Sequence, residues 1–265
     1  MPPSHPLLVQ LTRVWRLSGR WLPNGWLDAI RQLALFAGAY YLYRIVRGIV
    51  DGQAVIAFEN ARNIVDAERT LGLFFEPGLQ AWAEGTHWIT TVASWMYVNS
   101  HFVVTTTFLI WLYIARNHAF YFVRNMFLVA MGLALVGYMA YPTAPPRFLP
   151  EWGFSDSVAS FVGENAEQSA NVLYNPFAAV PSMHVAFALM IAVPAIMLTK
   201  RRVFKLLWAA YPLAVTFVVM ATANHFWMDA ALGAVVAAAS ASAASYAFAR
   251  ARPDAWAWRT AKARA

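Results

Sequence analysis

Two short strings combine the residue types needed for proton transfer and nucleophilic attack: Pro181–His184 (PSMH) and His225–Asp229 (HFWMD). Each string follows a polar stretch and opens a long apolar run. Ionisable side chains at the ends of apolar helices are costly to keep there, which makes them functional candidates. Histidine can attack phosphorus and can move protons near neutral pH. The strings therefore indicate a site built on two histidines and one aspartate.

The spacing of these residues suggests a role for each of them. His225 and Asp229 are four residues apart and share one face of a helix. Asp229 can accept a hydrogen bond from one imidazole nitrogen and leave the other nitrogen as the nucleophile. His184 then stands as the general acid for the leaving oxygen. These three residues are the predicted catalytic group.

Candidate phosphate ligands lie close to the same strings. Pro181 at the head of a helix leaves backbone N–H groups around Ser182 available to a phosphate. Arg147 can clamp the same oxygens through two parallel hydrogen bonds. Asn224, next to His225, is a further polar candidate, and Tyr141 opens the Tyr141–Arg147 string (YPTAPPR). Together they form the predicted substrate-binding group.

A second polar pair, Tyr97 and His101, is also spaced by four residues and lies inside an apolar run with Asn99 between its members. One interpretation is hydrogen bonding between helices. The other places His101 beside the lipid headgroup, as a substrate-binding residue.

Each feature also has a simpler interpretation. Interfacial histidines can be solvated residues at helix ends. Asp229 can be an acid near a helix N-terminus that the helix dipole stabilises, and Arg147 can anchor to lipid headgroups. Two histidines and an aspartate can also hold a metal. The i, i+4 pairing and the helix-start Pro-Ser-x-His together favour catalysis over these simpler interpretations, and we expect no cofactor.

The composition assigns most of the chain to a lipid environment. Hydrophobic residues make up 60% of the 265 residues and charged residues only 12%, about half the usual share for a soluble domain. Six apolar stretches are long enough, or nearly so, to cross a bilayer as helices. They are residues 29–50, 88–115, 119–141, 183–199, 203–222 and 226–249. The predicted fold is an all-α integral membrane bundle of six transmembrane helices. The absence of cysteine excludes disulfides, thiolate metal sites and cysteine nucleophiles.

Residues 54–70 show helical spacing of apolar residues with charged residues between them, which predicts an amphipathic helix in the outer interface. Glu68 on this segment is a weaker functional candidate. We divide the chain into an N-terminal tail (1–25), a membrane catalytic domain (26–249) and a basic C-terminal tail (250–265).

The net charge of +7 is distributed unevenly. Lysine and arginine gather in segments 13–20, 116–124, 200–205 and 250–264, all on one side of a six-span topology, whereas 51–87 and 142–182 are mainly acidic. The positive-inside rule makes the basic side cytoplasmic, with both termini there and the predicted site on the outer face of the cell membrane. Nucleic acid is a disfavoured partner, because no basic face with interleaved aromatic residues is present.

With these motifs the chain resembles the type 2 phosphatidic acid phosphatase superfamily over residues 55–249. The Pro181–His184 and His225–Asp229 strings are similar to its second and third signature motifs, and Tyr141–Arg147 is similar to the branch containing inositol phosphorylceramide synthases. The resemblance implies a six-helix membrane enzyme that uses a phosphohistidine intermediate and no metal. It implies His225 as nucleophile, Asp229 as its orienting partner, His184 as acid and base, and Arg147 as phosphate ligand.

The chain departs from the superfamily pattern at three positions. A lysine of the first motif is replaced by Ala140, and the Ser-Arg pair of the third motif is replaced by Val218 and Val219. The remaining ligands must then meet the phosphate charge, which favours the phosphotransferase-like branch.

The expected function is therefore transfer of a phosphoryl or headgroup-phosphoryl unit from a phosphorylated lipid to an alcohol at the outer leaflet. The resemblance to inositol phosphorylceramide synthases implies a role in sphingolipid metabolism. An ordinary lipid or polyprenyl phosphate phosphatase, with water as acceptor, is the main alternative. A small transporter is a distant one, because its polar residues would be spread through the membrane depth.

Overall fold

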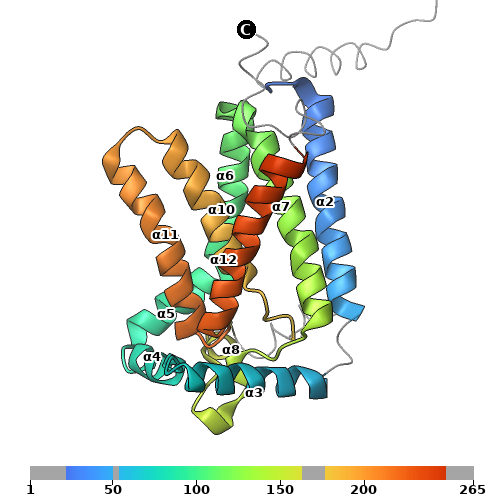
Figure 1. The fold of residues 1–265 in the computed structure, drawn as a ribbon. Helices are drawn as coiled ribbons and strands as arrows, with labels where there is room; N and C mark the ends of the chain where they lie inside the picture. Colours follow the sequence, from blue (N-terminus) through green and yellow to red (C-terminus); the bar gives the residue numbers. More distant parts are fainter. Residues whose placement is uncertain (1–21, 50–53, 163–176, 249–265) are drawn as a thin grey trace, which may run out of the picture.

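The apolar stretches of the sequence form long helices that lie side by side in a bundle (Figure 1). The computed structural model describes residues 22–49, 54–162 and 177–248. The helices of the bundle are α2 (Gly25–Ile49), α6 (His101–Ala115), α7 (Asn117–Ala140), α10 (Met183–Leu198), α11 (Arg202–Ala221) and α12 (Trp227–Ser242). All six predicted apolar stretches are thus helical.

Within the described part of the chain, four helical stretches are long and apolar enough to cross a membrane: His87–Ala115, Asn117–Ala140, Arg202–Ala221 and Trp227–Ala247. These stretches identify a helical membrane protein. The apolar helix α10 is shorter, at 16 residues, and contains Pro194. The predicted tails, up to residue 21 and from residue 249, lie outside the described residues.

The first of these stretches joins α5 (His87–Trp95) to α6 through a π-helical turn, η2 (Met96–Ser100). This turn contains Asn99. Its side-chain amide donates to the Trp95 carbonyl oxygen at 3.0 Å. The turn brings Tyr97 and His101 into the bundle, where they contact α10.

The predicted amphipathic helix is α3 (Ala54–Thr70), which lies across one end of the bundle (Figure 1). Its buried face contains Ala57, Ala61, Ile64, Val65 and Glu68. The short helices α4 (Glu76–Glu84) and α8 (Ser157–Val162) lie at the same end. This end of the bundle therefore has a cover of short interfacial helices.

A polar cluster joins α2 to the bundle at the opposite end. The carboxylate of Asp28 accepts hydrogen bonds from the hydroxyls of Tyr113 and Tyr121, both at 2.9 Å. The guanidinium of Arg124 donates to the side chains of Gln32 and Asn125 at 2.6 Å each. Arg124, which the sequence placed beside a turn, is therefore buried within α7.

Close approach between α12 and the start of α10 depends on a glycine. A Cβ atom added at Gly233 would lie 2.3 Å from the backbone oxygen of Ser182. Small residues along a helix allow backbones to come this close in membrane proteins. The alanine-rich and glycine-containing sequence of α12 thus brings its first turn against the Pro181–His184 string.

We expect Gly233→Ala to lower the thermal stability of the purified protein, because the methyl group meets backbone that cannot rotate away. Overpacking of this kind costs about 1–3 kcal/mol. Gly132→Ala in α7 is the matched control, since nothing lies within 4 Å of its added Cβ. The control should be neutral or stabilising by up to about 1 kcal/mol. Equal melting temperatures for the two variants in detergent would contradict the close approach.

Candidate active site

The Tyr141–Arg147 string is held against α3 and against the segment that leads into α10. The Asn60 side-chain amide donates to the Pro142 carbonyl at 2.8 Å, and the Ala144 N–H donates to the Ala57 carbonyl at 3.0 Å. Thr143 pairs with Ala178 in a parallel bridge. Arg147 is thereby brought close to the motifs that open α10 and α12.

Arg147 is buried, and contacts with Ala223, Asn224 and Asp156 help to hold it in place. Its backbone N–H donates to the Ala223 carbonyl at 2.8 Å, and its guanidinium donates to the side-chain oxygen of Asn224. Nε lies 3.2 Å from a carboxylate oxygen of Asp156. Ala223 has a φ of +50°, an unusual left-handed conformation for a residue with a side chain. This turn presents the Ala223 carbonyl and Asn224 to the arginine.

His225 and Asp229 are in contact, as their spacing predicts. Nδ1 of His225 lies 3.3 Å from Oδ2 of Asp229, and both residues are buried. The same oxygen accepts the N–H of Phe226 at 3.0 Å. A carboxylate held in this way can keep a proton on Nδ1 and leave Nε2 of His225 with its lone pair.

The Pro181–His184 string meets α12 at this point. The Ser182 N–H donates to the backbone oxygen of Asp229 at 3.0 Å, and Ser182 is the N-cap of α10. Its buried hydroxyl has no hydrogen-bond partner among the described residues. The first N–H groups of a helix also have no partner within the helix. The start of α10 therefore offers a hydroxyl and a helix N-terminus to an anion.

Aromatic rings form a row that connects α6 to α12 through His184. The ring centroids of His101 and His184 are 4.6 Å apart, and those of His184 and His225 are 5.7 Å apart. Tyr97 stacks on His184 at 4.7 Å, and Phe187 stacks on His101 at 5.1 Å. The row places both histidines of the predicted catalytic pair beside each other.

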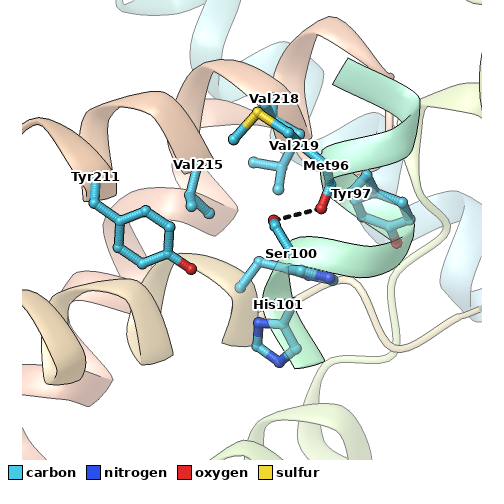
Figure 2. A pocket seen from close by; sticks show the side chains of 9 residues that line it. Met96, Tyr97, Ser100, His101, Tyr211, Val215, Val218 and Val219 are labelled. Carbon is cyan, nitrogen blue, oxygen red and sulfur yellow. Dashed lines mark hydrogen bonds between the residues drawn. The ribbon is translucent and has the colours of Figure 1, made fainter. Parts of the chain in front are cut away.

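A small pocket that His184 helps to line is shown in Figure 2. Val215, Val218 and Val219 of α11 face the residues of η2 and His101 of α6 across it. Val218 and Val219 are the residues that replace the superfamily's Ser-Arg pair, and both are buried. The side of the pocket that α11 forms is therefore apolar at the two positions where the sequence departs from the motif it resembles.

Seven of the eight sequence-predicted site residues are brought together by these contacts: Arg147, Asn224, His225, Asp229, Ser182, His184 and His101. Tyr141 is the exception. Its hydroxyl donates to the Asn60 carbonyl at 3.3 Å, so it helps to attach the string to α3. The sequence pattern predicts this segment as part of the site, but the direction of the Tyr141 side chain depends on α3.

Sequence reasoning overlooked two acidic residues of the site, Asp156 beside Arg147 and Glu76 beside α12, and gave Glu68 little weight. One signal was present for Glu68, because it continues the buried positions Ala57, Ala61 and Ile64 on α3. A carboxyl group on an apolar helix face needs a buried partner.

Comparison with known protein families identifies the family of this chain. The family model of the PAP2 superfamily matches residues 62–243, more than half of the chain. The matched region contains both histidine strings and the Tyr141–Arg147 string. No curated protein and no solved structure matches the chain significantly. Membership of this family supports an enzyme of the lipid phosphatase or phosphotransferase type. The chain belongs to the PAP2 superfamily.

Proposed function

We propose that this protein is a membrane lipid phosphotransferase that works through a phosphohistidine at His225, with His184 as acid and base. The observation that carries the proposal is the buried His225–Asp229 contact with the His184 ring 5.7 Å away between centroids. This arrangement supplies an oriented nucleophile and a separate proton donor in one site.

The reaction proceeds in two balanced steps. Nε2 of His225 attacks phosphorus while the bond to the leaving oxygen breaks, and protonated His184 gives its proton to that oxygen. The hydroxyl of an acceptor then attacks the phosphohistidine and gives its proton to His184, and the P–N bond breaks. The guanidinium of Arg147, the hydroxyl of Ser182 and the N-terminus of α10 hold the phosphate oxygens in both steps.

The electrostatics of the site favour a phosphodiester donor and headgroup transfer, as in inositol phosphorylceramide synthases. Val218 and Val219 make the wall beside His184 apolar. The charge of Arg147 is partly offset by Asp156 at 3.2 Å. A phosphodiester carries about one negative charge less than a phosphomonoester, so it suits a weakly cationic and water-excluding site better.

The ratio of transfer product to hydrolysis product tests this proposal. Purified protein is incubated with a labelled phosphodiester lipid, with and without inositol or a lipid alcohol such as ceramide. We expect transfer to the alcohol to exceed hydrolysis. Phosphate release from phosphatidate that no alcohol changes would support an ordinary phosphatase, and absence of turnover with every phospholipid would refute the proposal.

We further propose that both termini are cytoplasmic and that the site faces the outer leaflet, because of the charge distribution along the chain. The chain has no cysteine, so single cysteines can be introduced cleanly. Ser160 of α8 and Lys200 of the loop between α10 and α11 are exposed. Helix α8 and this loop lie at opposite ends of the bundle (Figure 1). An impermeant thiol reagent on intact cells should label Ser160→Cys and spare Lys200→Cys. The reverse labelling would show the opposite orientation.

A further inference from the structure

Three consecutive backbone N–H groups at the start of α12 donate to three different carboxyl groups. Phe226 donates to Asp229 at 3.0 Å, Trp227 donates to Glu76 at 2.9 Å, and Met228 donates to Glu68 at 3.1 Å. Glu68 lies on α3 and Glu76 begins α4. Both glutamates are fully buried. The interfacial helices thus contact the helix that carries Asp229 through two buried side chains.

These contacts occupy the positive end of α12. The first N–H groups of a helix have no intrahelical acceptor, and negative charge near them is favourable. At α12 these groups are used by carboxyl groups, whereas the start of α10 has the buried Ser182 hydroxyl without a partner. The two helix starts therefore differ in role. The start of α10 is available to a phosphate, whereas the first N–H groups of α12 are already bonded to carboxyl groups.

We propose that Glu68 and Glu76 are positioning residues that fasten the first turn of α12 to the interfacial helices and so hold His225 and Asp229 in place. This proposal rests on the proposed function, in which His225 is the nucleophile. A nucleophile displaced by about 1 Å loses roughly 100-fold in rate even when the substitution is remote from the chemistry.

The two glutamates use their oxygens differently. Both oxygens of Glu76 accept N–H groups, Oε1 from Trp227 and Oε2 from Phe75, each at 2.9 Å. A glutamine side chain has a single oxygen, so Glu76→Gln must lose one of these two acceptors. Oε1 of Glu68 accepts the N–H of Met228, and its buried Oε2 has no partner among the described residues. Glu68 therefore has an oxygen that can hold a proton, and glutamine can replace it.

The charges around Glu68 agree with a protonated side chain. Burial, together with repulsion by Glu76 of α4, raises its pKa to about 9, while the Met228 N–H acts in the opposite direction and Asp229 of α12 adds repulsion. The neighbouring Arg69 of α3 lies over the rings of Phe74 and Trp152. Because the folded protein keeps this proton and the unfolded chain loses it above pH 4.5, stability should fall as pH rises from about 4.5 to 9.

The test compares Glu68→Gln, Glu68→Leu and Glu76→Gln with Glu59→Leu, an exposed control on α3. Turnover and KM are measured at pH 7, and hydrogen exchange is measured on the peptide that contains Trp227 and Met228. We expect Glu68→Leu and Glu76→Gln to lower kcat about 10- to 100-fold with little change in KM and to speed exchange. Glu68→Gln and the control should resemble the unsubstituted protein.

Slow exchange in both damaging variants would overturn the proposal, and so would equal loss of activity in Glu68→Gln and Glu68→Leu. If Glu68→Leu does not fold, Glu68→Gln still tests the proposal. The melting temperature of Glu68→Gln should fall less between pH 6 and 9 than that of the unsubstituted protein. An identical fall would count against the proposal. Hydrogen exchange is measured in the absence of substrate. A protein that shows the exchange pattern but transfers no lipid phosphate would therefore refute the proposed function and keep the positioning role.

Discussion

The substitution His225→Asn is expected to abolish turnover and the covalent phosphoenzyme. Asparagine has a side-chain N–H that can still reach Asp229, so the buried carboxylate keeps a donor near the position of Nδ1, which lies 3.3 Å away in the structure. It has no ring nitrogen to bond to phosphorus. Loss of the nucleophile should lower kcat by about 10⁴-fold or more.

The measurement is labelling of the protein by a lipid whose transferred phosphorus is radioactive, with an alkaline quench, because phosphohistidine is stable to base. Brief acid treatment should then release the label, because phosphohistidine is labile to acid. His87→Asn is the control, since His87 is exposed at the start of α5. Labelling that persists in His225→Asn would exclude this histidine as the nucleophile. Activity that depends on added divalent metal and disappears with chelator would favour the metal site considered from the sequence.

His184 should behave differently, because it acts on the leaving oxygen. A general acid contributes about 10²–10⁴-fold, and a good leaving group needs it less. His184→Ala should therefore lose most activity with a lipid alkoxide as leaving group and little with a nitrophenolate.

The substitution Arg147→Lys is expected to lower kcat/KM by about 10²–10³-fold, the usual effect of removing one donor that stabilises transition-state charge. The guanidinium contacts Asn224 through one nitrogen and Asp156 through another, and the latter contact is 3.2 Å long. A lysine ammonium is a point charge without this planar fork. It cannot satisfy both neighbours and a phosphate with the same geometry.

Arg62→Lys is the matched control, because Arg62 is exposed on α3 and forms a long, exposed ion pair with Glu151 at 3.8 Å. The rates are measured with the phosphodiester donor that the purified protein uses best, together with the melting temperature of each variant. A loss of less than about threefold in Arg147→Lys, at unchanged stability, would show that another group holds the phosphate.

Much of the bundle follows from local patterns in the sequence. A helix that crosses lipid must satisfy its backbone hydrogen bonds internally, so long apolar runs are helical whatever surrounds them. This is why α7 and α11 begin and end close to the predicted residues. The four-residue spacing of His225 and Asp229 also predicts their contact, but the expected shared helix face is wrong. His225 precedes Phe226, the N-cap of α12, and Asp229 in the first turn of the helix reaches back to it.

The sequence by itself determined the membrane environment, the helical spans and the segments that meet at the site. Only the tertiary structure decided the partners of buried charges: Asp156 beside Arg147, and Glu68 and Glu76 at the first turn of α12. Glu76 is 151 residues away from Trp227 in the chain. Periodicity reports which face of one element is buried, but a buried carboxyl group is stabilised by a donor from another element. That donor is known only once the helices are packed.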